Sequence, residues 1–373
     1  MIKVLHFVST PAIWSGVMSV IMNYYRHMDH SKIQFDFLCF IPCGDSYEEE
    51  INKLGGRVFF IEKPQPSLRS LREIRDFFRE HQGEYTWFHN HEVYLSFLLK
   101  PMASHYGIPG FIIHSHATQY SDHRLAAMRN RILCMPIRLM RCQRFACSRA
   151  AGAFLFGERA IRDGKVHILY NAIDTERYRY DPETRRRLRK ELGIAEDTFV
   201  IGHVGRFVPQ KNHEFLLDIF QSWQQNWPHI QSRLLCIGGG PLMEQVKEQA
   251  FTFGLADKII FAGERRDVPA LLNLMDVFLL PSFFEGSPVS LVEAYCNGLS
   301  CVISDTIYWE NPSSQVCLVP LQASAKYWAG KVIEAAQKGR RAGKKPWIFD
   351  IRRQAQGLED IYQSLYSHFP LFI

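Results

Sequence analysis

The strongest constraint on the fold is an alternation of short apolar runs with longer amphipathic segments, which begins at the first residues. The runs at 2–9, 35–40, 57–61 and 87–91 are rich in β-branched and aromatic residues. Segments with the apolar spacing of helices follow these runs, at 17–28, 47–54, 68–80 and 95–105. Because parallel strands are joined by crossover helices, the alternation predicts an α/β fold with a doubly wound parallel sheet.

The alternation restarts after residue 172, and the chain is therefore expected to hold two such domains. At 373 residues it is longer than one ordinary core requires. A charged helix expected at 181–193 opens the second half, whose strand-like runs are FVIGHVGRF, SRLLCIGGG, DKIIFAG, VFLLPS and SCVISD. The predicted domains are 1–172, together with a C-terminal segment at about 352–373, and 173–351.

Composition narrows the class of protein without naming an activity. Hydrophobic residues make up 47% of the chain and charged residues 22%, which is typical of a folded globular protein. No apolar run approaches the ~20 residues that span a bilayer, and the N-terminus reads as a strand, so we expect a cytoplasmic protein. The nine cysteines include no CxxC pair. A net charge of +6 favours anionic partners, but no nucleic-acid-binding signature accompanies it.

The segment FFEGSPVSLVEA at 283–294 carries the strongest chemical signal, because it joins a polar loop to a helix start. Ser287 is a suitable N-cap and the following proline suits the first turn. The amides of Val289 and Ser290 would then point out of the helix N-terminus, which suits a diphosphate. With Gly286 and Ser287, these two residues form the predicted diphosphate loop.

Two carboxylates flank this helix start, Glu285 in the loop and Glu293 on the first turns. One carboxylate would bind sugar hydroxyls and the other a ribose diol. The alternative reading is an ordinary capped helix with a solvent-exposed glutamate.

Two cations follow an earlier strand of the same domain. Arg206 and Lys211 lie in the loop between a strand that ends near Gly205 and a helix that Asn212 is expected to cap. A guanidinium fork and a compact ammonium at a strand's carboxyl end suit a pyrophosphate. Either cation by itself would be read as a solvated surface residue.

These segments, with LLCIGGGP at 234–241 and IIFAGERRD at 259–267, resemble in order and spacing the donor-binding domain of family-4 retaining glycosyltransferases of the GT-B fold. The stretches ACSRAAGAFLFG and VHILYNAIDTERY look like those of bacterial exopolysaccharide and capsule enzymes. The resemblance implies two Rossmann-like domains facing across a cleft, with the last helix crossing back to the first domain.

The resemblance also implies roles for the residues of the second domain. Arg206 and Lys211 would hold the donor diphosphate, Glu293 the ribose and Glu285 the hydroxyls of the donor sugar. The backbone near Arg265 would face the base.

In the first domain, WSGVMSV resembles the glycine-rich first loop of the family. The family usually has two adjacent glycines there, whereas this chain has Ser15 and Gly16, so only Gly16 is expected at the donor. IIHSHAT resembles the segment in which a histidine approaches the reacting carbon, and His114 is the expected match. Ser115 and His116 would face the acceptor, and His114 joins Arg206, Lys211 and Glu285 in the predicted catalytic set.

A zinc site is the rival interpretation of the two HxH sequences, which include His89 and His91 as well as His114 and His116. No third ligand is spaced convincingly near either pair, and a structural role for His89 and His91 is at least as well supported as a functional one. The expectation is that no metal and no cofactor is bound.

The implied activity is transfer of a hexose-type sugar, with retained configuration, from a nucleotide-diphospho-sugar to a saccharide or lipid-linked acceptor in cell-surface polysaccharide synthesis. Uridine is the preferred base by resemblance, and guanosine and adenosine stay open. A dinucleotide-dependent oxidoreductase is disfavoured because WSGVMSV stands where GxGxxG would be needed. The other alternative is a non-catalytic nucleotide- or sugar-binding protein on the same fold.

The stretch at 123–144 interleaves arginines with apolar residues. It suggests a peripheral contact with the anionic inner face of the cell membrane. The alternative, slightly favoured, is a helix that packs by its apolar face and solvates its arginines.

Overall fold

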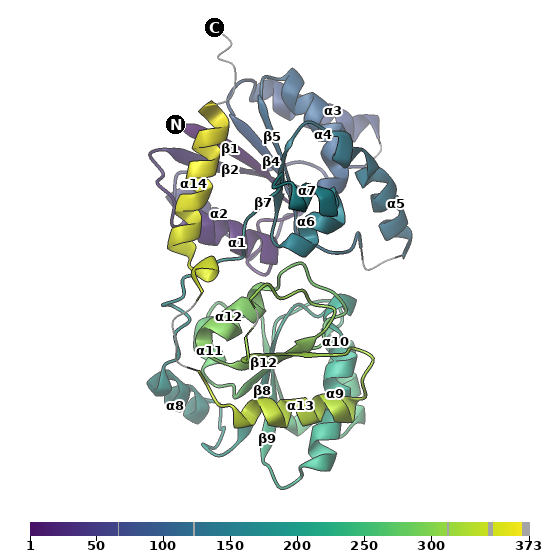
Figure 1. The fold of residues 1–373 in the computed structure, drawn as a ribbon, viewed down its shortest axis with the longest axis vertical. Helices are drawn as coiled ribbons and strands as arrows, with labels where there is room; N and C mark the ends of the chain where they lie inside the picture. Colours follow the sequence, from purple (N-terminus) through teal and green to yellow (C-terminus); the bar gives the residue numbers. More distant parts are fainter. Residues whose placement is uncertain (66, 122–123, 312, 342–345, 368–373) are drawn as a thin grey trace. The chain divides into compact units, whose positions relative to one another are not determined.

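The computed structural model describes residues 1–65, 67–121, 124–311, 313–341 and 346–367. The chain forms two compact units (Figure 1). Unit 1 comprises Met1–Ala172 and the segment from Asp350 onward, and unit 2 comprises Ile173–Phe349. Residues 368–373 of the predicted C-terminal segment, and His123 of the arginine-rich stretch, lie outside the described residues.

Unit 1 is built on a parallel sheet in the order β3-β2-β1-β4-β5-β6-β7. Its strands are β1 (Ile2–Phe7), β2 (Ile33–Cys39), β3 (Val58–Phe60), β4 (Trp87–Asn90), β5 (Gly110–Ser115), β6 (Gln143–Ala146) and β7 (His167–Ile168). Its helices are α1 (Gly16–Tyr25), α2 (Glu48–Lys53), α3 (Leu68–Glu80), α4 (Ser96–His105), α5 (Arg124–Cys134), α6 (Arg149–Phe156), α7 (Glu158–Arg162) and α14 (Ile351–Ser367). The 3₁₀ helices are η1 (Val93–Leu95) and η2 (Met135–Leu139).

Local signals explain where these helices start and which face they bury. The hydroxyl of Ser67 accepts from the backbone N–H of Ser70 at 3.2 Å and caps α3. Ile74, Phe77 and Phe78 form the buried face of α3, at the spacing that an amphipathic helix requires.

The last helix, α14, belongs to unit 1 although unit 2 separates it from the rest of that unit in the chain. It packs against α1, as the yellow and purple helices of Figure 1 illustrate. The carboxylate of Glu359 accepts from the backbone N–H of Asp29 at 2.6 Å. The buried ring of Tyr362 lies edge-on to Phe35 and near Trp87, and these contacts anchor α14 to unit 1.

Unit 2 repeats the architecture, with a parallel sheet in the order β10-β9-β8-β11-β12-β13. Its strands are β8 (Phe199–Val204), β9 (Ser232–Ile237), β10 (Ile259–Gly263), β11 (Val277–Leu280), β12 (Ser300–Ser304) and β13 (Val316–Val319). Its α-helices are α8 (Pro182–Glu191), α9 (His213–Asn226), α10 (Met243–Thr252), α11 (Val268–Leu272), α12 (Val289–Asn297) and α13 (Ala325–Gln337). The 3₁₀ helices are η3 (Pro209–Lys211), η4 (Ala256–Lys258) and η5 (Trp347–Phe349).

Each sheet has a point at which the strand order reverses. In unit 1 the chain first moves outward from β1 to β3 and then returns to the other side of β1 with β4. In unit 2 the same reversal separates β8 from β11. In open α/β sheets, ligands bind beyond the carboxyl ends of the strands at this switch point. The fold therefore predicts two candidate ligand-binding sites, one at the switch point of each unit.

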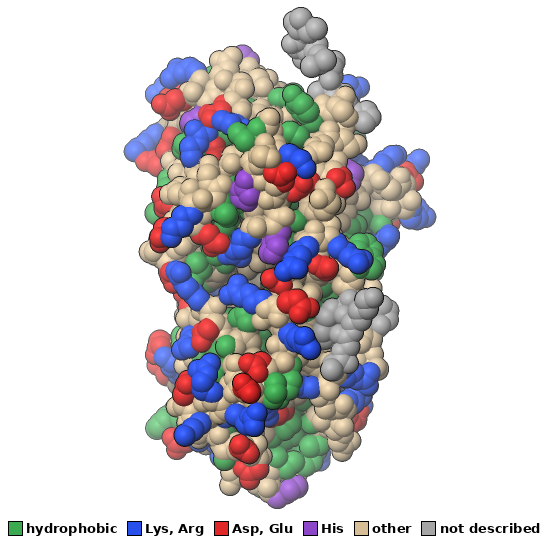
Figure 2. Space-filling view, turned by 90° about the vertical axis from the view of Figure 1, so that its left-hand side faces the viewer, with side chains coloured by type: hydrophobic (Ala, Val, Ile, Leu, Met, Phe, Trp, Pro, Cys, Tyr) green, Lys and Arg blue, Asp and Glu red, His purple; other side chains and the backbone are tan. Residues whose placement is uncertain are grey.

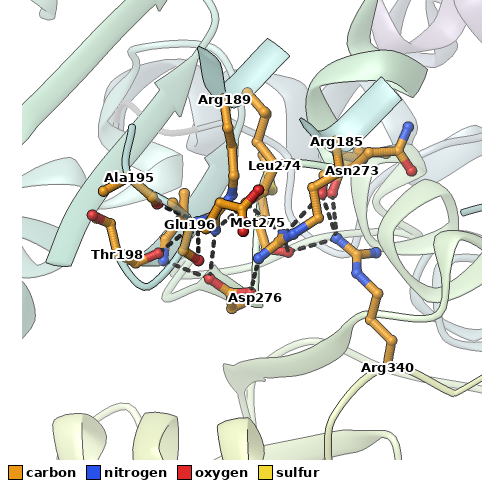
Figure 3. A network of polar contacts seen from close by, with 12 residues as sticks. Arg185, Arg189, Ala195, Glu196, Thr198, Asn273, Leu274, Met275, Asp276 and Arg340 are labelled. Atoms are coloured by element: carbon orange, nitrogen blue, oxygen red, sulfur yellow. Dashed lines mark hydrogen bonds and ion pairs between the residues drawn. The ribbon is translucent and has the colours of Figure 1, made fainter. Parts of the chain in front are cut away.

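A network of arginines surrounds Asp276, just before β11 (Figure 3). It lies at the amino ends of the unit 2 strands, opposite the switch-point site. The Asp276 carboxylate accepts from Arg185 at 2.6 Å, from Arg189 at 3.0 Å and from the backbone N–H of Val200 at 2.8 Å. Arg189 is buried and also donates to four backbone carbonyls. This network joins α8 to the sheet and serves stability.

Charge is distributed rather than concentrated on the face that Figure 2 shows. Basic and acidic side chains are interspersed over it, with histidines and apolar side chains between them. Within the described ranges, no helix has both the length and the apolar character needed to cross a bilayer.

Candidate functional site

The centre of the unit 2 site is an ion pair at the switch point. Lys211 Nζ lies 2.6 Å from Glu285 Oε1, and both side chains are largely buried. Lys211 follows β8 and Glu285 follows β11. Because these strands are adjacent, two residues far apart in sequence meet beyond the carboxyl ends of the strands. The structure thus brings together two of the predicted site residues.

Backbone and amide contacts hold this pair in place. Gln210 Nε2 donates to Glu285 Oε2 at 3.2 Å and to the carbonyl of Phe284 at 2.9 Å. Asn212 has a left-handed backbone, φ 56°, and its side-chain amide donates to the carbonyl of Pro281. Asn212 therefore occupies the N-cap position of α9 without capping it through its side chain, and instead ties the two loops together.

The GGG sequence lets a third loop approach the loop after β8. A Cβ on Gly238 would lie 2.1 Å from the carbonyl oxygen of Gly205, and one on Gly240 would lie 2.6 Å from that of Phe207. Both glycines also have positive φ angles, 137° and 147°. Only glycines at these positions allow this close packing of the two loops.

The N-terminus of α12 lies directly after the Glu285 loop. The N-cap residue is Pro288, so the predicted cap at Ser287 was one position early. The amides of Leu291 and Val292 donate to the Pro288 carbonyl, which leaves those of Val289 and Ser290 outside the intrahelical ladder. With Gly286 and Ser287, they form the turn predicted to meet a diphosphate.

Glu293 is buried on α12, and its Oε1 accepts from the hydroxyl of Tyr178 at 2.6 Å. Burial raises the pKa of Glu293 to about 7, although the Tyr178 hydrogen bond and the nearby Arg177 both oppose this rise. A carboxyl group that changes charge near neutral pH is well suited to a site that binds a polar ligand.

Two further predicted residues of unit 2 lie at the surface. Arg206 follows β8 and its side chain is exposed. Arg265 is also exposed, and its guanidinium donates twice to Asp267, at 2.7 Å each. Its side chain is thus engaged in a local ion pair.

In unit 1, the predicted first loop ends at α1. Ser15 is the N-cap of α1, and its hydroxyl accepts from the backbone N–H of Met18 at 3.4 Å. Gly16 is the first helical residue, is exposed, and would have open space around a Cβ. The serine that replaces the first glycine of the family loop therefore serves the helix start.

The HxH sequences fall on adjacent strands β4 and β5, and a fifth histidine from β1 joins them. Their rings gather on one face of the sheet: His6, His89, His91, His114 and His116. His114 has an exposed fraction of only 1%, whereas His116, just beyond β5, is partly exposed. Burial lowers the pKa of His6 to about 3 and of His116 to about 4. Burial, and secondly the neighbouring imidazoles, lower the pKa of the other three well below the ordinary value.

Ser115 does not share this face. Its hydroxyl is buried and donates to the carbonyl of Ala151 on α6 at 2.8 Å. Side chains alternate along a strand, so HSH presents its two histidines to one side and its serine to the other.

Three residues that contact predicted site residues were not identified from the sequence: Gln210, Tyr178 and His6. Gln210 was visible as a neighbour of Lys211, but nothing in the sequence linked it to Glu285. Tyr178 and His6 contact residues more than eighty positions away, and only the folded chain reveals such partners.

Comparison with known proteins gives two family matches that together cover most of the chain. The sequence model described as "Glycosyltransferase Family 4" matches residues 14–177, and that described as "Glycosyl transferases group 1" matches residues 184–309. The chain is 35% identical to the putative glycosyltransferase EpsF of Bacillus subtilis over 337 residues, covering 87% of this chain and 85% of the relative. It is 23% identical to the UDP-Gal:alpha-D-GlcNAc-diphosphoundecaprenol alpha-1,3-galactosyltransferase of Escherichia coli, over 82% of this chain and 79% of that protein.

Solved structures share the fold. Anabaena HepE in complex with UDP-glucose superposes with a TM-score of 0.75 at 19% identity, covering 98% of this chain and all of that one. Sucrose-phosphate synthase from Thermosynechococcus elongatus gives a TM-score of 0.72 at 14% identity, with 99% of this chain covered and all of the other.

Proposed function

Since this chain belongs to the family-4 glycosyltransferases of the GT-B fold, we propose that it is a retaining enzyme that moves a hexose from a UDP-sugar to a saccharide or lipid-linked saccharide. Its place would be the synthesis of a bacterial cell-surface polysaccharide. The name of the Escherichia relative supports the nucleotide-sugar donor and the lipid-linked acceptor, and that of the Bacillus relative supports glycosyl transfer.

The observation that carries the proposal is the Lys211–Glu285 pair beside the α12 N-terminus at the switch point of unit 2. An ammonium and free helix amides bind a diphosphate, while a neighbouring carboxylate binds hydroxyls. One buried cluster therefore offers both charges that a nucleotide-diphospho-sugar requires.

In the mechanism, the main demand is to stabilise negative charge that grows on the leaving phosphate as the glycosidic bond breaks. Lys211 and Arg206 supply positive charge, and the amides of Val289 and Ser290 supply hydrogen bonds. Removal of one preorganised donor of this kind typically lowers turnover by about 10²–10³. These groups make a metal ion or a cofactor unnecessary at the diphosphate, so we expect neither to be required for transfer.

Retention follows from attack on the face that the leaving group departs from. The departing phosphate would take the proton of the acceptor hydroxyl, so no protein carboxylate forms a covalent intermediate. Glu285 orients the sugar through its hydroxyls and is a positioning residue. Glu293 accepts hydrogen bonds from the ribose diol, and the backbone at Arg265 meets the base.

In unit 1, Gly16 allows the backbone to approach the donor. The sugar contact was predicted at His114, with Ser115 and His116 toward the acceptor. We propose that His116 provides the substrate contact of this segment, because His114 and Ser115 are buried while His116 reaches the surface.

The test of the donor site is a calorimetric titration with UDP, GDP and ADP. GDP belongs in the set because several relatives carry GDP-mannose in their names. We expect UDP to bind, and Lys211→Ala and Glu293→Ala to weaken it at least about tenfold. Lys247→Ala is the matched control, since this lysine of unit 2 pairs with Glu244 on the surface. If none of the three nucleotides binds, the donor-site assignment fails and the non-catalytic alternative takes its place.

The test of the reaction uses UDP-hexoses with a lipid-linked acceptor. NMR of the product should show the anomeric configuration of the donor, and turnover should persist in excess chelator. An inverted product would contradict the retaining assignment, and loss of turnover on chelation would contradict independence from metal.

We also propose a membrane contact, carried by the exposed face of α5 and η2. The apolar side chains there are 60% to 90% exposed and follow the spacing of one helical face: Leu125, Met128, Ile132, Met135 and Leu139. Exposed arginines accompany them, at positions 124, 129, 131, 138 and 141, and residues 124–144 contain no acidic residue. The alternative of a helix packed by its apolar face would have buried these side chains. Apolar insertion combined with positive charge suits an anionic bilayer.

Flotation with vesicles tests this contact. We expect the protein to float with phosphatidylglycerol vesicles at low salt, and to lose binding when Ile132 and Leu139 are both changed to Ser or when Arg131 and Arg138 become Glu. Phe251→Ser is the control, because this exposed residue lies in unit 2. Unchanged flotation of both double variants would remove the proposal.

A further inference from the structure

Five of the histidines of unit 1, namely His6, His89, His91, His114 and His116, form a ladder over three neighbouring strands. The register of β1 and β4 pairs His6 with His89, and that of β4 and β5 pairs Asn90 with Ile113, so that His91 lies beside His114. Residues two apart on a strand share a face, which adds His116 to the same row. The ladder therefore lies at the switch point of the unit 1 sheet.

A cavity of about 10 Å³ lies over this ladder. The five imidazoles line it, and the remaining lining side chains, from β2, α1, Leu169 and α14, are apolar or aromatic. This volume corresponds to roughly one water molecule. A space of this size can hold a single small ion but no organic ligand.

The hydrogen bonds form two chains, each with an open end. Tyr362 Oη lies 2.7 Å from His89 Nδ1, His89 Nε2 lies 3.1 Å from His114 Nδ1, and His114 Nε2 has no hydrogen-bond partner among the described residues. A neutral imidazole has one donor and one acceptor nitrogen. When His114 Nδ1–H donates to His89 and His89 Nδ1–H donates to Tyr362, the lone pair of His114 Nε2 is left buried and unused.

The second chain is compatible with the same arrangement. His6 Nδ1 lies 3.0 Å from His91 Nε2, and His91 Nδ1 lies 2.7 Å from His116 Nε2. When His91 Nε2–H donates to His6, the lone pair of His91 Nδ1 also turns toward His116. His91 Nδ1 then accepts from His116 Nε2–H, and a cation that binds between His91, His114 and His116 would take the place of this proton, leaving His116 protonated on Nδ1.

We propose that His91, His114 and His116 bind a divalent cation of the zinc class. Their ligand nitrogens all lie within 4.8 Å of one another. Zn–N bonds of ~2.0–2.1 Å place tetrahedral ligand nitrogens ~3.4 Å apart, which small rotations of the rings achieve. Three neutral imidazoles with an open fourth position form a known zinc arrangement.

A second triad, His6, His89 and His91, also has its nitrogens within 4.8 Å. All three of these residues are buried, whereas His116 is partly exposed and gives an ion both an access path and a water as fourth ligand. In addition, His89 and Tyr362 support His114 as outer-shell hydrogen-bond partners, which zinc ligands commonly have. These two features favour the triad that contains His116.

The experiment measures zinc on tag-free protein that has been stripped with a chelator and dialysed. We expect one zinc per chain on reloading, a visible absorption band when Co²⁺ replaces zinc, and a higher thermal midpoint with zinc. His116→Gln should weaken zinc binding at least about tenfold, and Tyr362→Phe should weaken it by a similar factor through the outer shell. His167→Gln should bind as the wild type does, because His167 lies on β7 of the same sheet, outside both triads.

Two outcomes overturn the proposal. One is absence of stoichiometric zinc in a wild-type protein that still unfolds cooperatively. The other is zinc binding that His6→Gln abolishes and His116→Gln leaves intact, which assigns the ion to the other triad. Because His116 is partly exposed, its variant is expected to fold, and a normal thermal midpoint without zinc checks this.

One consequence rests on the proposed function, in which His116 contacts the substrate. Zinc at the triad would occupy His116, so added zinc should lower transfer by the metal-free enzyme, and chelator should restore it. Zinc that binds without inhibition would contradict the role of His116 in transfer and leave the metal site intact, because binding is measured without substrate.

Discussion

At the scale of single residues, Glu293 shows how burial prepares a side chain for function. Its raised pKa, about 7, means that between the ordinary glutamate pKa and about 7 the folded protein binds a proton that the unfolded chain has lost. Its contribution to stability therefore falls as pH rises through that window. Ligand binding has the opposite dependence, because the ionised form accepts both hydrogen bonds of a diol.

We expect the affinity for UDP to be about tenfold lower at pH 6 than at pH 8, since ionisation falls tenfold for each pH unit below the pKa. Calorimetry across this range measures the slope. Glu293→Gln removes the titrating group and should leave only the slope due to the phosphate itself. An equal slope in both proteins would assign the dependence to the nucleotide.

Lys211 and Glu285 should separate binding from turnover. Glu285→Gln keeps a hydrogen-bond partner for Lys211, so the affinity for UDP should change less than about threefold while turnover falls by about 10²–10³. Lys211→Ala should weaken the binding of UDP itself. Titrations and initial rates on the same preparations distinguish the two effects. A Glu285→Gln protein that loses UDP affinity and turnover equally would assign Glu285 to the diphosphate.

For single residues, the sequence predicted which side chains belong to the candidate site better than it predicted which of them are in contact. Lys211 was singled out by its position after a strand and Glu285 by its position before a helix start, yet their contact depends on β8 and β11 being neighbours. For the histidines, the expectation of no metal rested on the lack of a third ligand nearby in the sequence. Sequence spacing does not reveal that His6 and both HxH pairs meet across β1, β4 and β5.

At the scale of elements, the arginine network fixes α8 to the sheet. Arg189→Ala removes one partner of a buried ion pair and leaves Asp276 and several carbonyls poorly satisfied, so we expect a loss of about 3–5 kcal/mol in the free energy of unfolding of unit 2. Urea denaturation measures it. Arg187→Ala is the control on the same helix, because its pair with Glu191 is exposed and should contribute less than about 1 kcal/mol. Similar unfolding curves for the two variants would count against the network.

Helix positions were well predicted because apolar periodicity and caps are local signals. The segment 68–80 became α3 with those bounds, and Ser67 caps it. The start of α12 was misplaced by one residue, since Ser287 and Pro288 both suit a helix start and only the backbone decides between them.

At the scale of the whole molecule, α14 belongs to unit 1 although all of unit 2 precedes it in the sequence. Tyr362→Ala removes a fully buried ring, and we expect a loss of about 3–5 kcal/mol for unit 1. Tyr362→Phe keeps the ring and loses the hydrogen bond to His89, with an expected loss of about 1–3 kcal/mol. Thermal unfolding followed by calorimetry resolves these changes. Gln363→Ala, an exposed neighbour on α14, should leave the midpoint unchanged, and a Tyr362→Ala protein that also melted normally would mean that α14 is dispensable.

The return of α14 has a consequence for synthesis on the ribosome. Translation delivers β1 to β7 first, then all of residues 173–349, and only then the helix that covers α1. At about 5–20 residues per second, the nascent first unit waits roughly 10–40 s with the apolar side of α1 uncovered. During that interval it is a natural client for chaperones that shield exposed apolar surface.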